Sequence, residues 1–369
     1  MSQVDVQISG SGAVASSLAL ALCQQGLRVA LSPARPPGDA PDVRAYALNA
    51  ASRELLLRLR VWDALPADAV TPVYDMRVYG DADDAALGFS AWDQGADALA
   101  WIVDAAELDA VLHDALRYAA HLQRSDKSQP AAALHVLAEG KDSTARAARG
   151  ISFERHSYEQ VAIAARLVSD RPHEDIATQW FRSPDVLALL PSDRPRGGAS
   201  FALVWSLPRA RATELAALDD AAFESELAQA TQGRCGTLQL AGARASWPLA
   251  LALAGEVCGP GWVLVGDAAH VVHPLAGQGL NLGLADVATL TAVLAGREAW
   301  RELGDERLLR RYARARALPT RLMAGLTDGL LHTFATERPL WRELRNRGLT
   351  LVNRAGPVKR WLTARALGH

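Results

Sequence analysis

The chain has 369 residues, of which 50% are hydrophobic and 22% are charged, and its formal net charge is −2. This balance is typical of a globular protein with a substantial core, and it excludes a strongly basic nucleic-acid-binding protein. Three widely spaced cysteines, Cys23, Cys235 and Cys258, argue against a disulfide framework or a zinc site and predict a reducing compartment. The first residues lack a signal-peptide pattern, and no apolar run reaches about 18 residues, so we expect a cytoplasmic protein without a spanning helix.

The first 140 residues follow the pattern of a nucleotide-binding βαβ unit and its continuation. Residues 4–9 (VDVQIS) predict a strand, the apolar spacing after them predicts a helix that ends at Gly26, and residues 27–32 (LRVALS) predict a second strand. Further helices are expected over 44–65 and 105–122, and a buried strand over 133–140. This order indicates a doubly wound parallel sheet.

The middle of the chain has a different sequence pattern. Residues 157–206 contain short β-rich stretches separated by Pro, Asp and Gly, which predict an antiparallel sheet. Residues 262–270 return to a parallel-sheet strand, and the chain after Gly279 is expected to be mostly helical. The predicted fold class is α/β, with a Rossmann-like domain, an inserted antiparallel β-sheet domain and C-terminal helices. The expected limits are 1–75, 96–150 and 255–300 for the Rossmann-like domain, 76–95 and 151–254 for the β-sheet domain, and 301–369 for the helical region.

The first glycine-rich turn is GSGAVA, in which Gly10, Gly12 and Ala15 occupy the three key positions of a GxGxxG-type fingerprint. The first permits a tight turn, the second lets a pyrophosphate approach backbone N–H groups, and the third allows close packing of helix on strand. A plain strand–turn–helix would have the same pattern. The acidic residue that normally ends the second strand and binds the ribose is replaced by Pro33.

A second dense turn region, GDAAHVVHPLAGQGLNLGLAD, covers residues 266–286. It follows a strand and leads into a helix, so it offers free N–H groups and a partial positive charge at a helix N-terminus. Gly277 and Gly279 lack Cβ atoms, which would let a flat ring lie against their backbone, and Asp267 could bind the hydroxyls of a polyol chain. His270 and His273 have no third ligand nearby, so no metal site is predicted.

This segment resembles the second flavin-binding motif of the flavin-dependent aromatic hydroxylases. The form HPLAGQGLNLGL is similar to the ubiquinone-biosynthesis branch, the UbiH/UbiF/VisC family. The stretches RAYALNAASRELLLRLRVWDAL, RPHEDIATQWFRSPDVLALLPS and YARARALPTRLMAGLTDGLLHTF resemble other parts of that family, so the resemblance covers nearly the full chain.

The resemblance implies an FAD-dependent monooxygenase. An external electron donor such as NAD(P)H would reduce the flavin, and O2 would form a C4a-hydroperoxide that hydroxylates a phenolic polyprenyl ring in ubiquinone biosynthesis. Carried over by position, the cofactor-binding residues are Gly10, Gly12, Ala15, Arg44, Asp267, Pro274, Gly277, Gln278, Gly279 and Asn281. Trp180, Phe181 and Trp205 either line the substrate or belong to an ordinary core. No catalytic residue can be named.

Several positions depart from the family pattern. Besides Pro33, Ala106 stands where the family usually has an arginine ahead of its mid-domain helix. The GADGANSRVR motif appears as LAEGKDSTAR, with Glu139 for Asp and Thr144 for Arg, and the polar loop at 123–133 is shorter than usual. Each lost polar contact costs about 1–2 kcal/mol. The alternative is therefore a non-catalytic relative that binds FAD weakly or not at all and acts as a scaffold; other flavin redox chemistry, such as that of a dehydrogenase, is a third reading.

The C-terminal region, residues 341–369, carries seven Lys or Arg against one Glu, interspersed with Trp, Leu and Val. Such a surface could rest on anionic lipid at the inner membrane, dock on the FAD domain by its apolar side, or bind another pathway protein. The expected partners are a phenolic or polyprenyl-phenol substrate and O2, with no nucleic acid.

Overall fold

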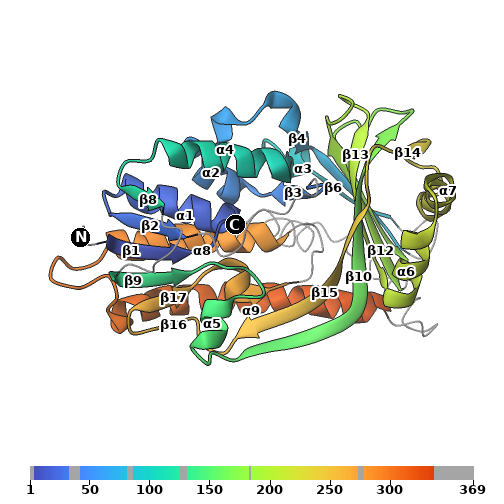
Figure 1. The fold of residues 1–369 in the computed structure, drawn as a ribbon. Helices are drawn as coiled ribbons and strands as arrows, with labels where there is room; N and C mark the ends of the chain where they lie inside the picture. The colour runs from blue at the N-terminus through green and yellow to red at the C-terminus, as the bar shows by residue number, and fades with distance from the viewer. Residues whose placement is uncertain are drawn as a thin grey trace.

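The computed structural model describes residues 4–32, 42–80, 86–124, 131–182, 184–272 and 278–335. Within these residues the chain forms two large sheets and one small sheet. Figure 1 shows the larger sheet standing across the end of a layered unit of helices and strands.

The first sheet has six strands in the order β16-β17-β9-β1-β2-β8. Its strands are β1 (Val4–Ser9), β2 (Val29–Ser32), β8 (Leu122–Arg124), β9 (Ala132–Leu137), β16 (Cys258–Gly259) and β17 (Trp262–Leu264). All neighbouring pairs are parallel except β16 with β17. The expected strands at the start of the chain are thereby confirmed, and those expected over 133–140 and 262–270 are present but shorter, ending at Leu137 and Leu264.

Helices pack against this sheet to form the largest core. They are α1 (Ala13–Gln24), α2 (Ala50–Arg58), α4 (Ala105–Arg117), α8 (Gln278–Ala295) and α9 (Glu306–Ala335). The short helix α5 (Thr144–Ala148) packs through Ala145 in a smaller cluster with Leu137 and Leu264. Short 3-10 turns are η1 (Trp62–Ala64), η2 (Ala67–Ala69) and η3 (Gly266–Ala268). Apolar residues of α1, α4, α8 and α9 join those of β1, β2, β9 and β17 in one buried cluster. The layered α/β arrangement follows from these apolar faces.

Two helix predictions need correction. The stretch 44–65 is not one helix: β3 (Ala45–Leu48) pairs antiparallel with β7, and α2 starts only after Asn49, whose side chain accepts from the Ser52 N–H. Tertiary strand pairing overrides the helix propensity of AYAL. The helix expected over 105–122 ends at Arg117, because His121 adopts a positive φ and Leu122 begins β8.

The second sheet has nine strands and is mostly antiparallel. Its order is β18-β15-β10-β13-β12-β11-β5-β6, with β14 paired to β10. The strands are β5 (Asp75–Tyr79), β6 (Ala86–Ser90), β10 (Phe153–Ser169), β11 (Ile176–Arg182), β12 (Asp185–Ser192), β13 (Ser200–Pro208), β14 (Leu238–Leu240), β15 (Ala245–Ala254) and β18 (His270–Val271). The β-rich middle of the chain therefore forms the antiparallel sheet that the sequence predicts. The predicted domain limits stay a prediction; β18, from the second glycine-rich segment, also joins this sheet.

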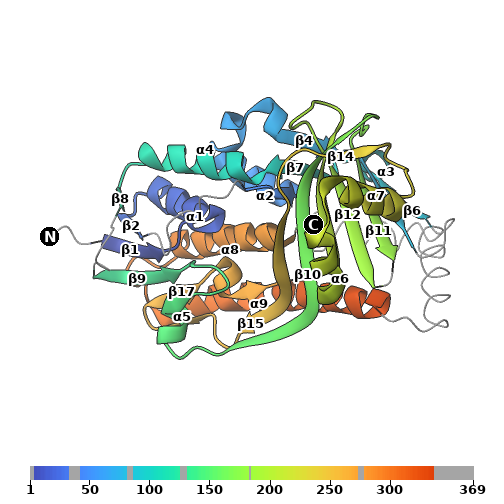
Figure 2. The same ribbon diagram turned by 45° about the vertical axis from the view of Figure 1, so that its right-hand side comes forward.

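The two faces of the large sheet differ. One face packs on α6 (Arg209–Ala217) and α7 (Asp220–Thr231) through large side chains that include Trp180 and Trp205. The other face presents smaller residues such as Ala177 and Ala202 to the small sheet. That small sheet consists of β3, β4 (Val70–Val73) and β7 (Ala100–Asp104), and α3 (Ala91–Gln94) lies beside β6. Figure 2 shows α6 and α7 on the side of the sheet that is turned away from the layered unit.

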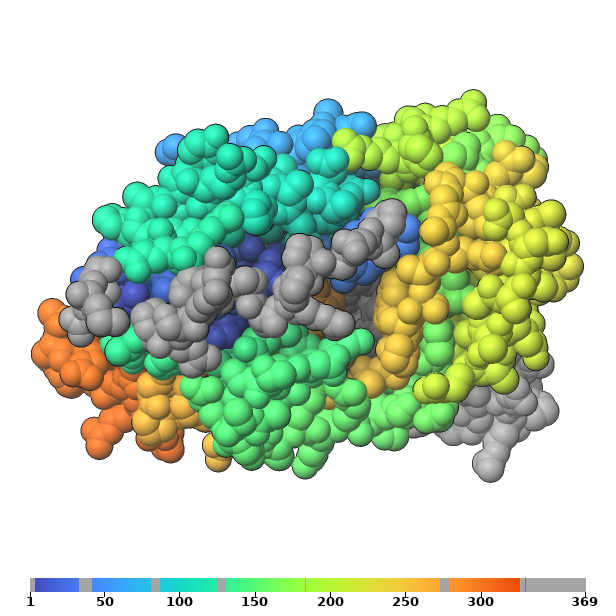
Figure 3. Space-filling view, in the orientation of Figure 1, coloured from blue at the N-terminus to red at the C-terminus, as the bar shows by residue number. Residues whose placement is uncertain are grey.

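The two units are also joined by charged side chains. Arg194, which follows β12, donates to Glu107 on α4 at 2.6 Å and to Asp68 in η2 at 2.8 Å. Figure 3 shows this contact region at the top of the view, where yellow-green atoms meet blue and teal ones. The large sheet is thereby held against the carboxyl end of the parallel sheet, the edge at which α/β folds bind ligands.

Candidate cofactor site

The turn between β1 and α1 brings the chain close to β9. Gly10 has a φ of +145°, and a Cβ there would lie 2.2 Å from the carbonyl oxygen of Ala138. Gly12 is the N-cap of α1, makes no side-chain cap, and has no atom within 4 Å of where a Cβ would be. The first turn of α1 therefore presents uncapped N–H groups to open space, an arrangement suited to a phosphate. Ala15 is buried and lets α1 pack on the sheet.

A second close approach places α8 against α1. A Cβ on Gly283 would lie 2.5 Å from the Val14 side chain, and one on Gly266 would lie 3.2 Å from the same residue. Gly266 also has a φ of +61°. Neither glycine is among the predicted site residues, although both belong to the glycine-dense segment 266–286. Their effect is to bring the N-terminal half of α8 beside the N-terminus of α1.

A buried ionic cluster holds the second glycine-rich segment. Asp286 is fully buried and accepts from the Gly266 N–H at 2.8 Å, from His270 Nε2 at 2.7 Å and from Arg316 Nε at 2.6 Å. Burial opposes the imidazolium of His270, but the charge and hydrogen bond of Asp286 raise its pKa above the usual value. Burial likewise opposes the charge of Asp286, but His270 and Arg316 hold its pKa below the usual value. The cluster is therefore a buried carboxylate between two cations.

The clamp formed by Asp286, His270 and Arg316 is extended by two further hydrogen bonds from α9. Arg316 donates to the Leu282 carbonyl at 3.1 Å, and the buried Tyr312 hydroxyl donates to the Leu264 carbonyl at 3.0 Å. Strand β17, turn η3, strand β18 and helix α8 are thus tied to α9 on both sides of residues 273–277. The sequence reasoning missed Arg316 and Tyr312, because nothing in the linear pattern pairs them with the glycine-rich segment.

Asn281 ties α8 to the turn after β3. Its Oδ1 accepts from the Asn49 N–H at 3.0 Å and from the Ser52 hydroxyl at 2.7 Å, while its Nδ2 donates to the Ala47 carbonyl at 2.8 Å. The side chain is buried and directed at protein partners. Its evident task is to hold the β3–α2 turn beside the start of α8.

Charged side chains also lie at the edge where the N-termini of α1 and α8 meet. Asp267 in η3 keeps exposed surface, yet the protein around it removes enough water to raise its pKa, while His270 and Arg44 act in the opposite direction. Arg44 donates to Asp42 at 2.8 and 2.6 Å and lies 5.7 Å from the Tyr46 ring centre. Asp109 on α4 has its pKa raised to about 6, first by burial.

Comparisons with known proteins identify the family. Residues 93–324 match the family model described as an FAD binding domain. The chain is 32% identical to the 3-demethoxyubiquinol 3-hydroxylase of Escherichia coli over 99% of this chain and 98% of that protein. It is 30% identical to the ubiquinone hydroxylase UbiL of Rhodospirillum rubrum over 99% of this chain and 89% of that protein. The chain belongs to the FAD-dependent hydroxylases of ubiquinone biosynthesis.

Solved structures agree on the fold of this hydroxylase. PqsL of Pseudomonas aeruginosa in complex with 2-aminobenzoylacetate superimposes with a TM-score of 0.77 at 19% identity, covering 95% of this chain and all of that one. A point variant of HpxO from Klebsiella pneumoniae, complexed with FAD, gives 0.75 at 18% identity, covering 98% of this chain and 99% of that one. At these identities the likeness establishes the fold alone.

The residues present fit FAD. The uncapped N-terminus of α1 suits a pyrophosphate, the space around Gly12 and Gly279 is free of atoms within 4 Å of a Cβ position, and Asp267 and Arg44 stand nearby. Gln278 is the first residue of α8, which places its backbone at the helix N-terminus. Pro274, Gly277 and His273 lie outside the described residues, as does Pro33.

The departures from the family pattern have distinct structural consequences. Ala106 is exposed in the first turn of α4. Glu139 accepts from the Ser143 hydroxyl at 2.8 Å and from the Ala145 N–H at 2.9 Å, so it supports the N-terminus of α5, whose N-cap is Ser143. Arg146 donates to the Ala268 carbonyl at 2.9 Å and thereby joins α5 to η3. The glutamate therefore still organises the turn in which the family has aspartate.

The three candidate substrate-lining residues do not all lie on the same face of the large sheet. Trp180 stacks on Tyr79, and Trp205 packs edge-on to Phe223 beneath α6 and α7, so both belong to the core on the face turned away from the cofactor edge. Phe181 lies on the opposite face with Val186. The two tryptophans are therefore core residues, and substrate contact by Phe181 stays a prediction.

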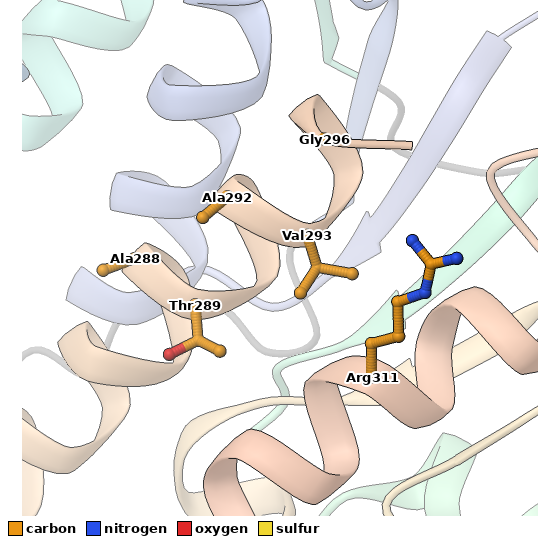
Figure 4. Close-up of a pocket in the computed structure, with 6 residues that line it drawn as sticks. All are labelled: Ala288, Thr289, Ala292, Val293, Gly296 and Arg311. Atoms are coloured by element: carbon orange, nitrogen blue, oxygen red, sulfur yellow. The ribbon is translucent and has the colours of Figure 1, made fainter. Parts of the chain in front are cut away.

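In the described part of the chain, neither the pockets nor the metal-ligating side chains indicate a second functional site. A pocket of about 520 Å³ lies between the C-terminal half of α8 and α9, lined by small side chains and Arg311, away from the N-terminus of α8 (Figure 4). Another of about 680 Å³ lies between β15, β16 and α9 and reaches His270 and Asp286 from behind the clamp. Among the described residues no cluster of metal-ligating side chains exists, and none of their helices is long and apolar enough to span a membrane.

Proposed function

We propose that the protein is an FAD-dependent monooxygenase that hydroxylates the phenolic ring of a polyprenylated precursor in ubiquinone biosynthesis. It uses O2 and an external electron donor such as NAD(P)H. The observation that carries the proposal is the meeting of the α1 N-terminus, Arg44, Asp267 and the α8 N-terminus at the carboxyl edge of the parallel sheet, facing the large sheet. The alternative of a non-catalytic scaffold has no support in the fold, the site or the relatives.

The proposed FAD contacts are Gly10, Gly12, Ala15, Arg44, Asp267, Pro274, Gly277, Gln278, Gly279 and Asn281. Bound FAD would supply the activation of O2 and the transfer of one oxygen atom. The chain's own residues would bind and orient it: the α1 N–H groups hold the pyrophosphate, Asp267 accepts from ribityl hydroxyls, and the clamp at Asp286 keeps the second glycine-rich segment in place.

We further propose that the enzyme contacts an anionic bilayer at the cytoplasmic side of the inner membrane, where a polyprenyl substrate would dissolve. Leu318 and Leu322 are 65% and 40% exposed on α9. Arg314 and Arg321 are exposed on the same stretch of helix. Such a basic, apolar surface suits a headgroup region. The basic region 341–369 lies outside the described residues. Pathway proteins are the competing partner for this surface.

Two measurements test the proposal. Flavin per chain, from the visible spectrum before and after FAD titration, should approach one; a protein that takes up no FAD at high concentration would end the enzyme assignment. With labelled O2, a prenylated phenol and a reductant, the product should carry one labelled oxygen atom.

The membrane contact has its own test. Co-sedimentation with vesicles containing anionic lipid should fall with salt and should be weakened in a double variant Leu318→Glu and Leu322→Glu. The matched control is Tyr118→Glu, which changes an exposed residue at the end of α4. Binding that is equal for neutral and anionic vesicles, or unchanged in the α9 variant, would contradict the contact.

A further inference from the structure

Arg166 on β10 reaches from the large sheet to the cofactor edge. Its Nη2 donates to Asp104 Oδ2 at 2.6 Å and to the Arg44 carbonyl at 2.7 Å. The side chains of Arg166 and Asp104 are only 11% and 15% exposed. A guanidinium from one unit is thus fixed against the residue that precedes β3 and the residue that caps α4 in the other.

Burying the Arg166 guanidinium at this position carries a desolvation cost. Burial lowers the pKa of Arg166, while the carboxylates of Asp104 and Asp42 act in the opposite direction. On β10 it follows Ala164 on the same face, and it stands opposite Ala202 of β13. An apolar side chain would pack there without the desolvation penalty of a buried ion. Packing alone therefore does not explain the Arg166–Asp104 ion pair. A requirement for positive charge at this position does.

Asp104 links Arg166 to the turn that contains Ala106. Asp104 Oδ1 accepts from the N–H groups of Ala106 and Glu107 at 3.0 and 3.2 Å, while Oδ2 accepts from Arg166. One carboxylate therefore bridges the first turn of α4 and the guanidinium of Arg166. Ala106, which stands where the resemblance places an arginine, belongs to that same turn.

We propose that Arg166 supplies beside bound FAD the positive charge that position 106 lacks, acting on the anionic pyrophosphate side of the cofactor. The inference rests on the proposed function, since it needs FAD at this edge. Asp42 already pairs with Arg44, and Asp104 pairs with Arg166, so the carboxylates offset the local cations. Removal of Arg166 would leave the Asp104 carboxylate without its cation on this side of the site and would weaken binding by electrostatic repulsion.

The test is a double-mutant cycle on FAD affinity, measured by quenching of flavin fluorescence on the apoprotein. Arg166→Ala should weaken FAD binding about tenfold or more, and Arg166→Lys, which keeps the charge but not the fork of donors, should fall between. Ala106→Arg should restore most of the affinity in the Arg166→Ala background and improve wild type much less. Such non-additivity means that the two positions serve one site.

A matched control and the contrary outcomes complete the design. Arg211→Ala removes an ion pair with Asp185 and Glu226 beside α6 and should leave FAD affinity unchanged. Equal FAD affinity in wild type and Arg166→Ala, or an equal gain from Ala106→Arg in both backgrounds, would overturn the inference. If Arg166→Ala does not fold, Arg166→Lys and Ala106→Arg, alone and combined, make the same comparison. A wild-type protein that binds no FAD would overturn the proposed function as well.

Discussion

The two ends of the cofactor edge are built differently. At the second glycine-rich segment, Asp286 is fully buried with three donors directed at it, and α9 closes the cluster from behind. At the other end, the β1–α1 turn has open N–H groups, Ala106 carries no charge, and Arg166 arrives from another unit. The first end is held by bonds between protein groups, whereas the second offers backbone N–H groups that a ligand would satisfy. Stability and affinity are therefore expected to respond to different substitutions.

The largest effect is expected at the clamp. Asp286→Asn removes a buried charge and leaves His270 and Arg316 facing a neutral amide, which should lower the free energy of unfolding by about 3–5 kcal/mol. Urea denaturation measures this. The matched control is Asp142→Asn, whose carboxylate is 71% exposed and pairs with Arg155; it should change stability by less than about 0.5 kcal/mol. Equal stability of the two variants would show that the clamp does not hold the fold.

The clamp also predicts a pH dependence. The raised pKa of His270 means that its contribution is full below the unfolded value of 6.5 and is lost as the pH rises through the folded pKa. The lowered pKa of Asp286 means that its contribution is present above 3.8 and is lost as the pH falls through the folded pKa. Unfolding measured between about pH 4 and about pH 9 should therefore reveal a fall on the alkaline side that is absent in His270→Gln.

The next largest effects are expected in the β1–α1 turn, where two glycine substitutions should separate stability from FAD binding. Gly10→Ala places a Cβ 2.2 Å from the Ala138 carbonyl at a positive φ, so it should destabilise the protein by about 2–4 kcal/mol. Gly12→Ala meets no atom within 4 Å and should leave stability nearly unchanged. It should nevertheless weaken FAD binding about tenfold, because the methyl group occupies the approach of the pyrophosphate. A Gly12→Ala protein with wild-type affinity would place the pyrophosphate elsewhere.

A smaller effect of opposite sign is expected at Asp109. Its folded pKa of about 6 exceeds the unfolded value of 3.8, so the folded state gains stability as the pH falls between these values. Asp109→Asn should raise the free energy of unfolding at about pH 7 by about 1–2 kcal/mol and should remove this dependence. Thermal unfolding at about pH 4.5 and about pH 7 compares the two proteins. A variant that is less stable at neutral pH would contradict the sign.

The smallest effect is expected between α2 and α8. Ser52→Ala removes the hydroxyl that donates to Asn281, but the Asn49 N–H still donates to the same oxygen. The cost should be about 0.5–1 kcal/mol in urea denaturation, with FAD affinity unchanged. A loss of affinity larger than the loss of stability would mean that this turn is positioned for the cofactor.

Much of the fold could be predicted because its signals are local. The strand–glycine–helix pattern at residues 4–24 and the β-rich runs of β10 to β13 follow from periodicity and turn residues. Prediction from local sequence failed where residues far apart in the chain determine the structure. Residues 45–48 became a strand because β7 pairs with them, and Trp180 and Trp205 face α6 and α7 because of the sheet register.

The sequence by itself determined the family, the α/β class and the two glycine-rich segments, because each depends on residue types at fixed short spacing. The tertiary structure decided which distant side chains meet. It alone placed Arg316 on Asp286, Asn281 on Ser52 and Arg166 on Asp104, across separations of 30, 229 and 62 residues. Local spacing carries no information on such contacts, because they arise only when packed helices and paired strands fix the distances between elements.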